Sequence, residues 1–91
     1  MITEFVWIFN GSKGKFPGGI FSRLDIAEQW IRDNRLNGVL TRYPLDIGSF
    51  DWAKAEGLVS EKLEGRADSE FVGSFSSASF EQYHYEDGGR Q

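Results

Sequence analysis

Phe5-Val6-Trp7-Ile8-Phe9 is the most apolar stretch of this 91-residue chain, and it decides the fold. Glu4 precedes it and the turn pair Asn10-Gly11 follows it. A short run of aromatic and β-branched side chains that ends at a turn signal is typical of a strand buried on both faces. We therefore expect residues 5–9 to form a central strand of a sheet.

Both faces of this strand need a cover, because side chains alternate between the two sides of a sheet. Phe5, Trp7 and Phe9 share one face, whereas Val6 and Ile8 share the other. One cover is expected to be a helix. The second cover is either more of this chain or another molecule, and this alternative bears directly on function.

The segment after the first strand predicts a hairpin. Residues 10–14 supply the positive φ angles that a hairpin loop requires, so residues 4–10 should pair with residues 15–21. Pro17 has no backbone donor and the two glycines after it weaken a strand. We therefore expect residues 15–21 to form an irregular strand at the edge of the sheet.

An amphipathic helix is expected to follow, beginning where Ser22 and Asp25 resemble a capping box. Apolar residues recur at helical spacing across 24–31 and form a stripe that can cover one face of the sheet. The asparagines and glycine of residues 34–38 supply its stop.

The middle of the chain predicts one strand and one short helix. Residues 39–43 are rich in strand formers, and Pro44 marks an edge strand or the exit of the strand. Ser49 can cap a helix over residues 50–56, and Gly57 is suited to end it in the left-handed conformation.

The last third predicts a mobile loop, two strands and a frayed end. Residues 60–69 are polar with weak periodicity, which is typical of a loop. Residues 71–75 and 80–85 alternate well enough to form a C-terminal hairpin, and residues 87–91 are expected to fray. The order β-β-α-β-α-β-β predicts a single α+β domain over residues 1–91, with an antiparallel or mixed sheet of about five strands. One long helix should pack on a face, beside one short helix.

Composition and charge exclude several classes of function. The chain has no cysteine, so it has no disulfide framework, no thiolate zinc site and no cysteine nucleophile. The net charge is −4, made up of +2 for residues 1–45 and −6 for the remainder. This balance argues against nucleic-acid binding and favours a basic partner for the second half. We expect a cytoplasmic protein without a membrane segment.

Few residues are candidates for catalysis or metal binding. His84 is the only histidine, and with Glu86 and Asp87 beside it in sequence it offers too few ligands for a usual zinc site. Asp46 and Asp51 are explained by a turn and by the first turn of a short helix. The Gly- and Lys-rich residues 11–15 lack the spacing of a phosphate-binding loop. We therefore predict no catalytic residue, no metal ligand and no cofactor, and we expect the protein not to be an enzyme.

The aromatic residues are better candidates for binding a partner, because tryptophan and tyrosine are enriched at the centres of protein interfaces. Tyr83 and Tyr85 alternate with His84 on the last predicted strand, next to acidic residues, and both tyrosines are expected to be exposed. The predicted partner-binding residues are Tyr83, His84, Tyr85, Glu81, Glu86 and Trp7.

Several motifs resemble those of a family of small bacterial single-domain proteins of unknown function. The resemblance covers most of the chain outside residues 60–69, and it implies a bacterial, cytoplasmic, single-domain protein without a transferable activity. The family tends to have a further histidine where this chain has Gln82, which weakens a role for paired histidines. The motifs are VWIFNG at 6–11, FPGGIFS at 16–22, AEQWI at 27–31, GVLTRYPLD at 38–46, FDWA at 50–53 and YHYEDG at 83–88.

Three hypotheses follow. The first is a protein-interaction module, monomeric or homodimeric, that uses the sheet face left free by the long helix. The second is an immunity or antitoxin protein that binds a basic toxin through its acidic C-terminal half. The third is a small enzyme or metal-binding protein that uses His84.

Overall fold

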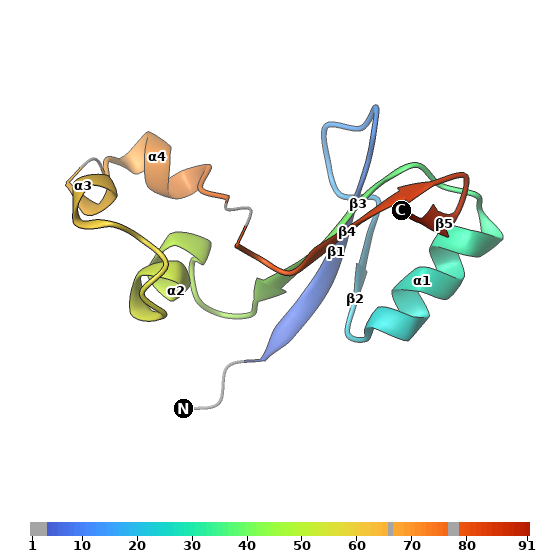
Figure 1. The fold of residues 1–91 in the computed structure, drawn as a ribbon, viewed down its shortest axis with the longest axis horizontal. Coiled ribbons are helices and arrows are strands. Elements are labelled where there is room, and N and C mark those ends of the chain that lie inside the picture. Colours follow the sequence, from blue (N-terminus) through green and yellow to red (C-terminus); the bar gives the residue numbers. More distant parts are fainter. Residues whose placement is uncertain (1–3, 66, 77–78) are drawn as a thin grey trace.

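A computed structural model describes residues 4–65, 67–76 and 79–91 and shows an α+β fold with a five-stranded antiparallel sheet (Figure 1). The strand order across the sheet is β2-β1-β3-β4-β5. The fold class predicted from the sequence is confirmed. The strands are β1 (Phe5–Gly11), β2 (Gly19–Phe21), β3 (Gly38–Pro44), β4 (Gln82–Glu86) and β5 (Gly89–Arg90). The helices are α1 (Leu24–Asp33), α2 (Ser49–Ala55), α3 (Glu61–Glu64) and α4 (Ser69–Gly73).

The sheet is built on the pairing of β1 with β3. These strands pair along seven positions, from Phe5 opposite Pro44 to Gly11 opposite Gly38. β1 is interior, as predicted, because β2 pairs with its other side. β2 is a three-residue edge strand, as the proline and glycines before it predicted. Pro44 closes β3 and so marks the exit of the strand.

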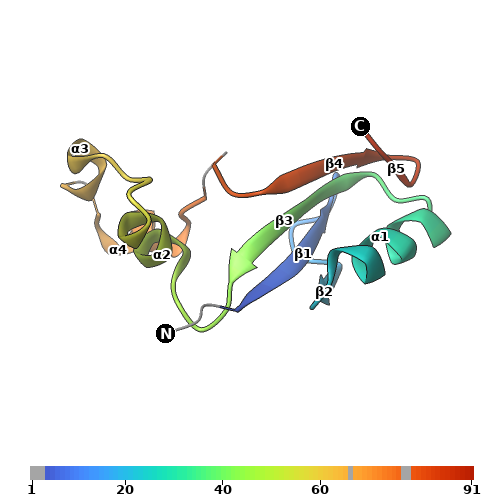
Figure 2. The ribbon, with the colours of Figure 1, turned by 60° about the horizontal axis from the view of Figure 1, so that its bottom comes forward.

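α1 covers one face of the sheet (Figure 2). Its buried residues Ala27 and Ile31 pack on Trp7, Phe9 and Leu40, which the strand register places on the same face. The opposite face carries the alternate residues of β1 and β3. None of the helices in the described part of the chain lies over it, since α2 to α4 gather beyond one end of the sheet (Figure 2).

The ends of two helices differ in part from the prediction. Ser22 does not cap α1: the N-cap is Arg23, without a side-chain cap, and Asp25 instead accepts a hydrogen bond from the Ile26 amide. At α2 the N-cap is Gly48 rather than Ser49. The predicted stop at Asn34 is confirmed, because Asn34 is the C-cap of α1.

Two short helices, α3 and α4, form where a loop and a strand were predicted. α3 lies within the expected loop 60–69, and residues 71–73 of the expected strand 71–75 belong to α4. One physical reason for α4 is local, because the Asp68 carboxylate accepts a hydrogen bond from the Phe71 amide and caps the helix. The prediction of a C-terminal hairpin from 71–75 and 80–85 was therefore wrong.

β4 pairs instead with β3 and with β5, the strand formed where a frayed end was expected. Asp87 and Gly88 join β4 to β5 with φ angles of +48° and +82°. Two successive positive φ angles are what a type I′ hairpin turn requires, and Asp-Gly is a preferred sequence for it. The turn is fixed to the rest of the molecule, since the Gly88 amide donates to the Leu36 carbonyl over 3.0 Å.

An aromatic cluster joins the helical end to the sheet. Trp52 of α2 contacts Phe5 of β1 edge-to-face, with ring centroids 5.7 Å apart. Phe80, just before β4, contacts Trp52 at 5.4 Å and Tyr43 of β3 at 5.7 Å. These contacts attach α2 to the end of the sheet where β1 begins.

Gly38 begins β3 at a position that tolerates no side chain. Its φ is +157°, and a Cβ atom there would lie 2.3 Å from the Asn10 carbonyl oxygen and 2.7 Å from the Phe9 ring. We predict that Gly38→Ala lowers the free energy of unfolding by about 3 kcal/mol or more, because backbone strain adds to overpacking. Urea unfolding measures this change. Gly73→Ala is the control, since a Cβ at Gly73 meets nothing within 4 Å, and equal losses in the two variants would contradict the prediction.

Candidate functional site

The face of the sheet opposite α1 is the main candidate for a contact surface, and we call it the open face. The strand register defines it through residues that alternate with the core. Its members in the sheet are Val6, Ile8, Asn10, Ile20, Val39, Thr41, Tyr43, Gln82, His84 and Glu86.

The open face is apolar at its centre and polar along β4. Ile20 of the edge strand is 64% exposed, and Val6, Ile8 and Val39 beside it are half-buried. In isolation, one exposed isoleucine is ordinary for a protein surface. Here it extends a row of aliphatic side chains, since Ile20 pairs with Ile8 of β1. The β3 partner of Ile8 is the buried Thr41, and Val39 lies diagonally from Ile8 on the same face. The open face therefore combines an aliphatic part on β1 and β2 with a polar margin along β4, and apolar surface beside polar residues is typical of protein interfaces.

The predicted site residues of β4 divide between the two faces. His84 and Glu86 are exposed and lie on the open face, where His84 pairs with Val39. Tyr83 and Tyr85 lie on the face that α1 covers. The expectation that both tyrosines are exposed was wrong, because Tyr85 is only 5% exposed and Tyr83 is half-buried.

Trp7 and Glu81 complete the predicted set, and both lie with Tyr83. The Trp7 ring stacks on the Tyr83 ring with centroids 5.8 Å apart, and Trp7 is 8% exposed. The Tyr83 hydroxyl donates to the Glu81 carboxylate. In this structure Trp7 and Tyr85 thus belong to the hydrophobic core, and Tyr83 packs against it.

The Glu28 carboxylate of α1 accepts hydrogen bonds from both β4 and β5. Glu28 accepts a hydrogen bond from the Tyr85 hydroxyl over 2.6 Å. Arg90 of β5 donates to the same oxygen from Nε over 2.9 Å and from Nη2 over 2.6 Å. The Arg90 guanidinium also lies 3.9 Å from the centroid of the Tyr83 ring, in the arrangement of a cation–π contact.

The pKa values of this cluster follow from its geometry. Burial acts to raise the pKa of Glu28, but the hydrogen bonds from Tyr85 and Arg90 outweigh it and the pKa is lowered. Burial and the hydrogen bond to Glu28 raise the pKa of Tyr85 far above its ordinary range. Tyr85 is therefore a neutral hydrogen-bond donor at neutral pH, and its role is structural.

Sequence reasoning missed this cluster because Glu28 lies 57 residues from Tyr85 and 62 from Arg90. Nothing in the local sequence around any of the three residues signals the contact. Ile20 was recognised only as part of an edge strand. The alternation of β1 did predict the outer face, since Val6 and Ile8 were assigned to the side opposite Trp7.

A metal centre does not assemble around His84. Among the residues that the structure describes, no group of three or more His, Cys, Asp or Glu side chains could hold a metal ion. His84 faces outward, its partner on β3 is Val39, and Glu86 is the one acidic residue that shares its face of β4.

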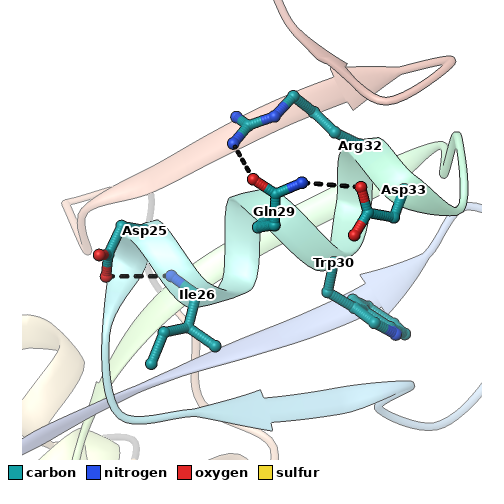
Figure 3. Close-up of a pocket in the computed structure, with 6 residues that line it drawn as sticks. All are labelled: Asp25, Ile26, Gln29, Trp30, Arg32 and Asp33. Atoms are coloured by element: carbon teal, nitrogen blue, oxygen red, sulfur yellow. Dashed lines mark hydrogen bonds between the residues drawn. The ribbon is translucent and has the colours of Figure 1, made fainter.

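A hollow with a volume of about 520 Å³ lies along α1 (Figure 3). Its polar groups are already paired with one another: Gln29 donates to Asp33 over 2.7 Å and accepts from Arg32 over 3.1 Å. The ring of Trp30 forms its apolar side and packs on Phe21 at 5.3 Å. The lining contains neither a histidine nor a hydroxyl nucleophile, and we assign it no chemistry.

The comparisons with known proteins give one match. A family described as a domain of unknown function, DUF7710, matches residues 6–91. No curated protein and no solved structure matches the chain. Within the described residues, no helix has both the length and the apolar character needed to cross a membrane.

The hydrogen bond between Glu28 and Tyr85 should be measurable as stability. We predict that Glu28→Ala lowers the free energy of unfolding by about 1–3 kcal/mol, because it leaves the Tyr85 hydroxyl buried without its acceptor. Gln29→Ala, in the same helix but exposed, is the control and should change stability by less than about 0.5 kcal/mol. If Tyr85→Phe and Glu28→Ala were strictly additive in the double variant, the proposed coupling would not exist.

The lowered pKa of Glu28 gives the stability of the protein a defined pH dependence. A carboxylate whose pKa is lower in the folded than in the unfolded state stabilises the fold above its ordinary value of 4.5. This contribution is lost as the pH falls through the lower, folded-state pKa. We predict that wild type and Glu28→Gln differ in unfolding free energy above pH 4.5 and converge below it. A difference that is constant from pH 7 down to pH 2.5 in urea titrations would contradict the assignment.

Proposed function

The chain belongs to the DUF7710 family, whose function is unknown, and we propose that it is a non-enzymatic protein-interaction module that pairs with a second copy through its open face. A bacterial and cytoplasmic setting is part of this proposal, and it rests on the sequence resemblance alone. The observation that carries the proposal is the row of aliphatic side chains that ends at Ile20, 64% exposed, on a face that no described helix covers.

Pairing of two open faces has a clear physical benefit. Val6, Ile8 and Val39 are half-buried within one chain, so a facing sheet would remove the remainder of their surface from water. Each aliphatic side chain that becomes fully buried contributes roughly 1–3 kcal/mol at most. The contact would be isologous, because the same residues face each other across a twofold axis.

The polar margin of the open face suits such a contact. Gln82, His84 and Glu86 form one edge of the face along β4, outside its aliphatic centre. Polar residues at a rim stay hydrated and fix the register of two partners without a large desolvation cost. His84 and Glu86, two of the residues predicted from the sequence to bind a partner, thus keep that role in the proposal.

The acidic helical end supports a second candidate function, that of an immunity or antitoxin protein. Residues 46–76 hold seven carboxylates against three basic residues. Leu45, Ile47 and Leu58 are exposed at the same end of the molecule. A basic toxin would be attracted by this charge, and its complex would weaken with salt.

The proposed pairing is tested by Ile20→Lys, which places a charge in the aliphatic row that the contact would bury. We expect wild type to have twice the mass of one chain by light scattering in 0.5 M NaCl, and Ile20→Lys to have the mass of one chain. High salt screens contacts between charged surfaces and preserves an apolar one. The control is Ile26→Lys, since Ile26 is also exposed, at 47%, but lies on α1.

Two results would overturn the pairing. The first is a wild-type mass of one chain at millimolar concentration in 0.5 M NaCl. The second is a dimer that Ile20→Lys and Ile26→Lys weaken equally. Thermal unfolding followed by circular dichroism establishes that both variants retain the fold.

A further inference from the structure

The loop between β1 and β2 presents the most exposed large apolar side chain in the described part of the chain. Phe16 is 79% exposed. Lys13 and Lys15 are the only charged residues of residues 12–18, so the loop carries +2 in a chain of net charge −4. Figure 1 shows the loop standing clear of the helices and of the rest of the sheet.

Backbone hydrogen bonds fix both ends of this loop. The Ser12 amide donates to the Asn37 carbonyl over 3.0 Å, and the Gly18 amide donates to the Phe9 carbonyl over 2.8 Å. Between them the Gly14 amide closes a turn onto the Gly11 carbonyl over 3.0 Å. The loop is thus anchored to β1 and to the start of β3, and little ordering is needed before Phe16 can bind.

The helical end of the molecule carries a cavity suited to an aromatic side chain. The cavity has a volume of about 410 Å³ and is lined by Leu63, Phe71, Ser74, Phe75 and Ser76. The rings of Phe71 and Phe75 lie 5.7 Å apart and both contact Phe50 edge-to-face, at 5.6 and 5.3 Å. A further phenyl ring could extend this cluster in the geometry that aromatic pairs prefer.

The charge around the cavity is opposite to that of the loop. The two helices that form it, α3 and α4 with the cap of α4, carry Glu61, Glu64, Asp68 and Glu70. Lys62 is the basic residue of these helices, and Lys54 of α2 lies 3.5 Å from the Glu64 carboxylate. An apolar cavity in an acidic surface therefore matches a phenylalanine between two lysines in both shape and charge.

The loop cannot reach the cavity of its own chain. The helical end is attached at Phe5, where β1 begins, and the loop follows Gly11, where β1 ends. Seven residues of extended strand separate these points by about 20 Å. The two surfaces can meet only between two molecules.

We propose that Phe16 of one copy binds the α3–α4 cavity of a second copy, with Lys13 and Lys15 facing the carboxylates around it. The contact is head-to-tail, so it either closes by reciprocal exchange or continues into larger assemblies. No residue of the loop or of the cavity lies on the open face, so this contact goes beyond the proposed function and does not rest on it. An anionic membrane is a less suitable occupant, because the rest of the chain is acidic and two lysines attract such a surface weakly.

The test uses two variants made in the Ile20→Lys background, which removes the open-face contact. Phe16→Ser disables the loop, and Ser74→Arg fills the cavity with a cationic side chain. We expect the parent to self-associate at 20 mM NaCl and to dissociate as salt is raised. Each variant alone should associate roughly tenfold or more weakly than the parent, the change expected for losing one buried aromatic contact.

Mixing the two variants gives the decisive result. A molecule with a disabled loop still has a free cavity, and a molecule with a filled cavity still has a free loop. The mixture should therefore form a complex of twice the mass of one chain that cannot grow further. Leu58→Ser is the control, because Leu58 is exposed but is not among the residues that line the cavity.

Three outcomes would overturn the head-to-tail contact. They are a parent that stays monomeric at millimolar concentration in 20 mM NaCl, a mixture that fails to associate, and association that Leu58→Ser weakens as much as Phe16→Ser. Binding of the parent to phosphatidylserine vesicles that Phe16→Ser abolishes would assign the loop to a membrane instead. Failure of the open-face pairing shows separately, in the wild-type mass at 0.5 M NaCl.

Discussion

The seven-position pairing of β1 with β3 is the constraint on which the rest of the structure depends. Because side chains alternate with a period of two, this one register assigns Trp7, Phe9 and Leu40 to one face and Ile8 and Val39 to the other. α1 packs on the first of these faces, through Ala27 and Ile31. A shift of the register by one residue would exchange the two faces, so the core and the open face are fixed by the same pairing.

The C-terminal strands β4 and β5 are held to this core by polar contacts as well as by apolar ones. β4 places Tyr85 beneath α1, where Glu28 accepts from its hydroxyl, and Arg90 of β5 meets the same carboxylate. A buried hydroxyl without an acceptor would oppose this packing, so the position of Glu28 on α1 supports the docking of β4. The charge of Glu28 is in turn stabilised by Arg90, which links the end of the chain to its first helix.

Local signals in the sequence predicted most elements of the fold, and contacts distant in sequence explain what they missed. The apolar run of β1, the hairpin to β2, the stripe of α1 and the left-handed Gly57 all have local causes. Residues 71–75 were ambiguous, because Phe71 and Phe75 fit both alternation and a helical i, i+4 spacing. Their contacts with Phe50, about twenty residues earlier in the chain, favour the helix. For β4, alternation separated Tyr83 and Tyr85 correctly from His84, but only the position of α1 decides which set is buried.

The second half of the chain explains why no described helix covers the open face. Covering it would need a second amphipathic helix of about the length of α1, whose ten residues span about 15 Å. The residues between β3 and β4 are numerous enough to supply one. Where the structure describes this segment, it forms instead three helices of seven, four and five residues, and Phe50 of α2, Phe71 of α4 and Phe75 contact one another. Trp52 and Phe80 then attach this cluster to the end of the sheet rather than to its face. The aromatic residues of the second half are thus used to build an acidic end with its own cavity, and none of the described helices covers the aliphatic side chains of the open face.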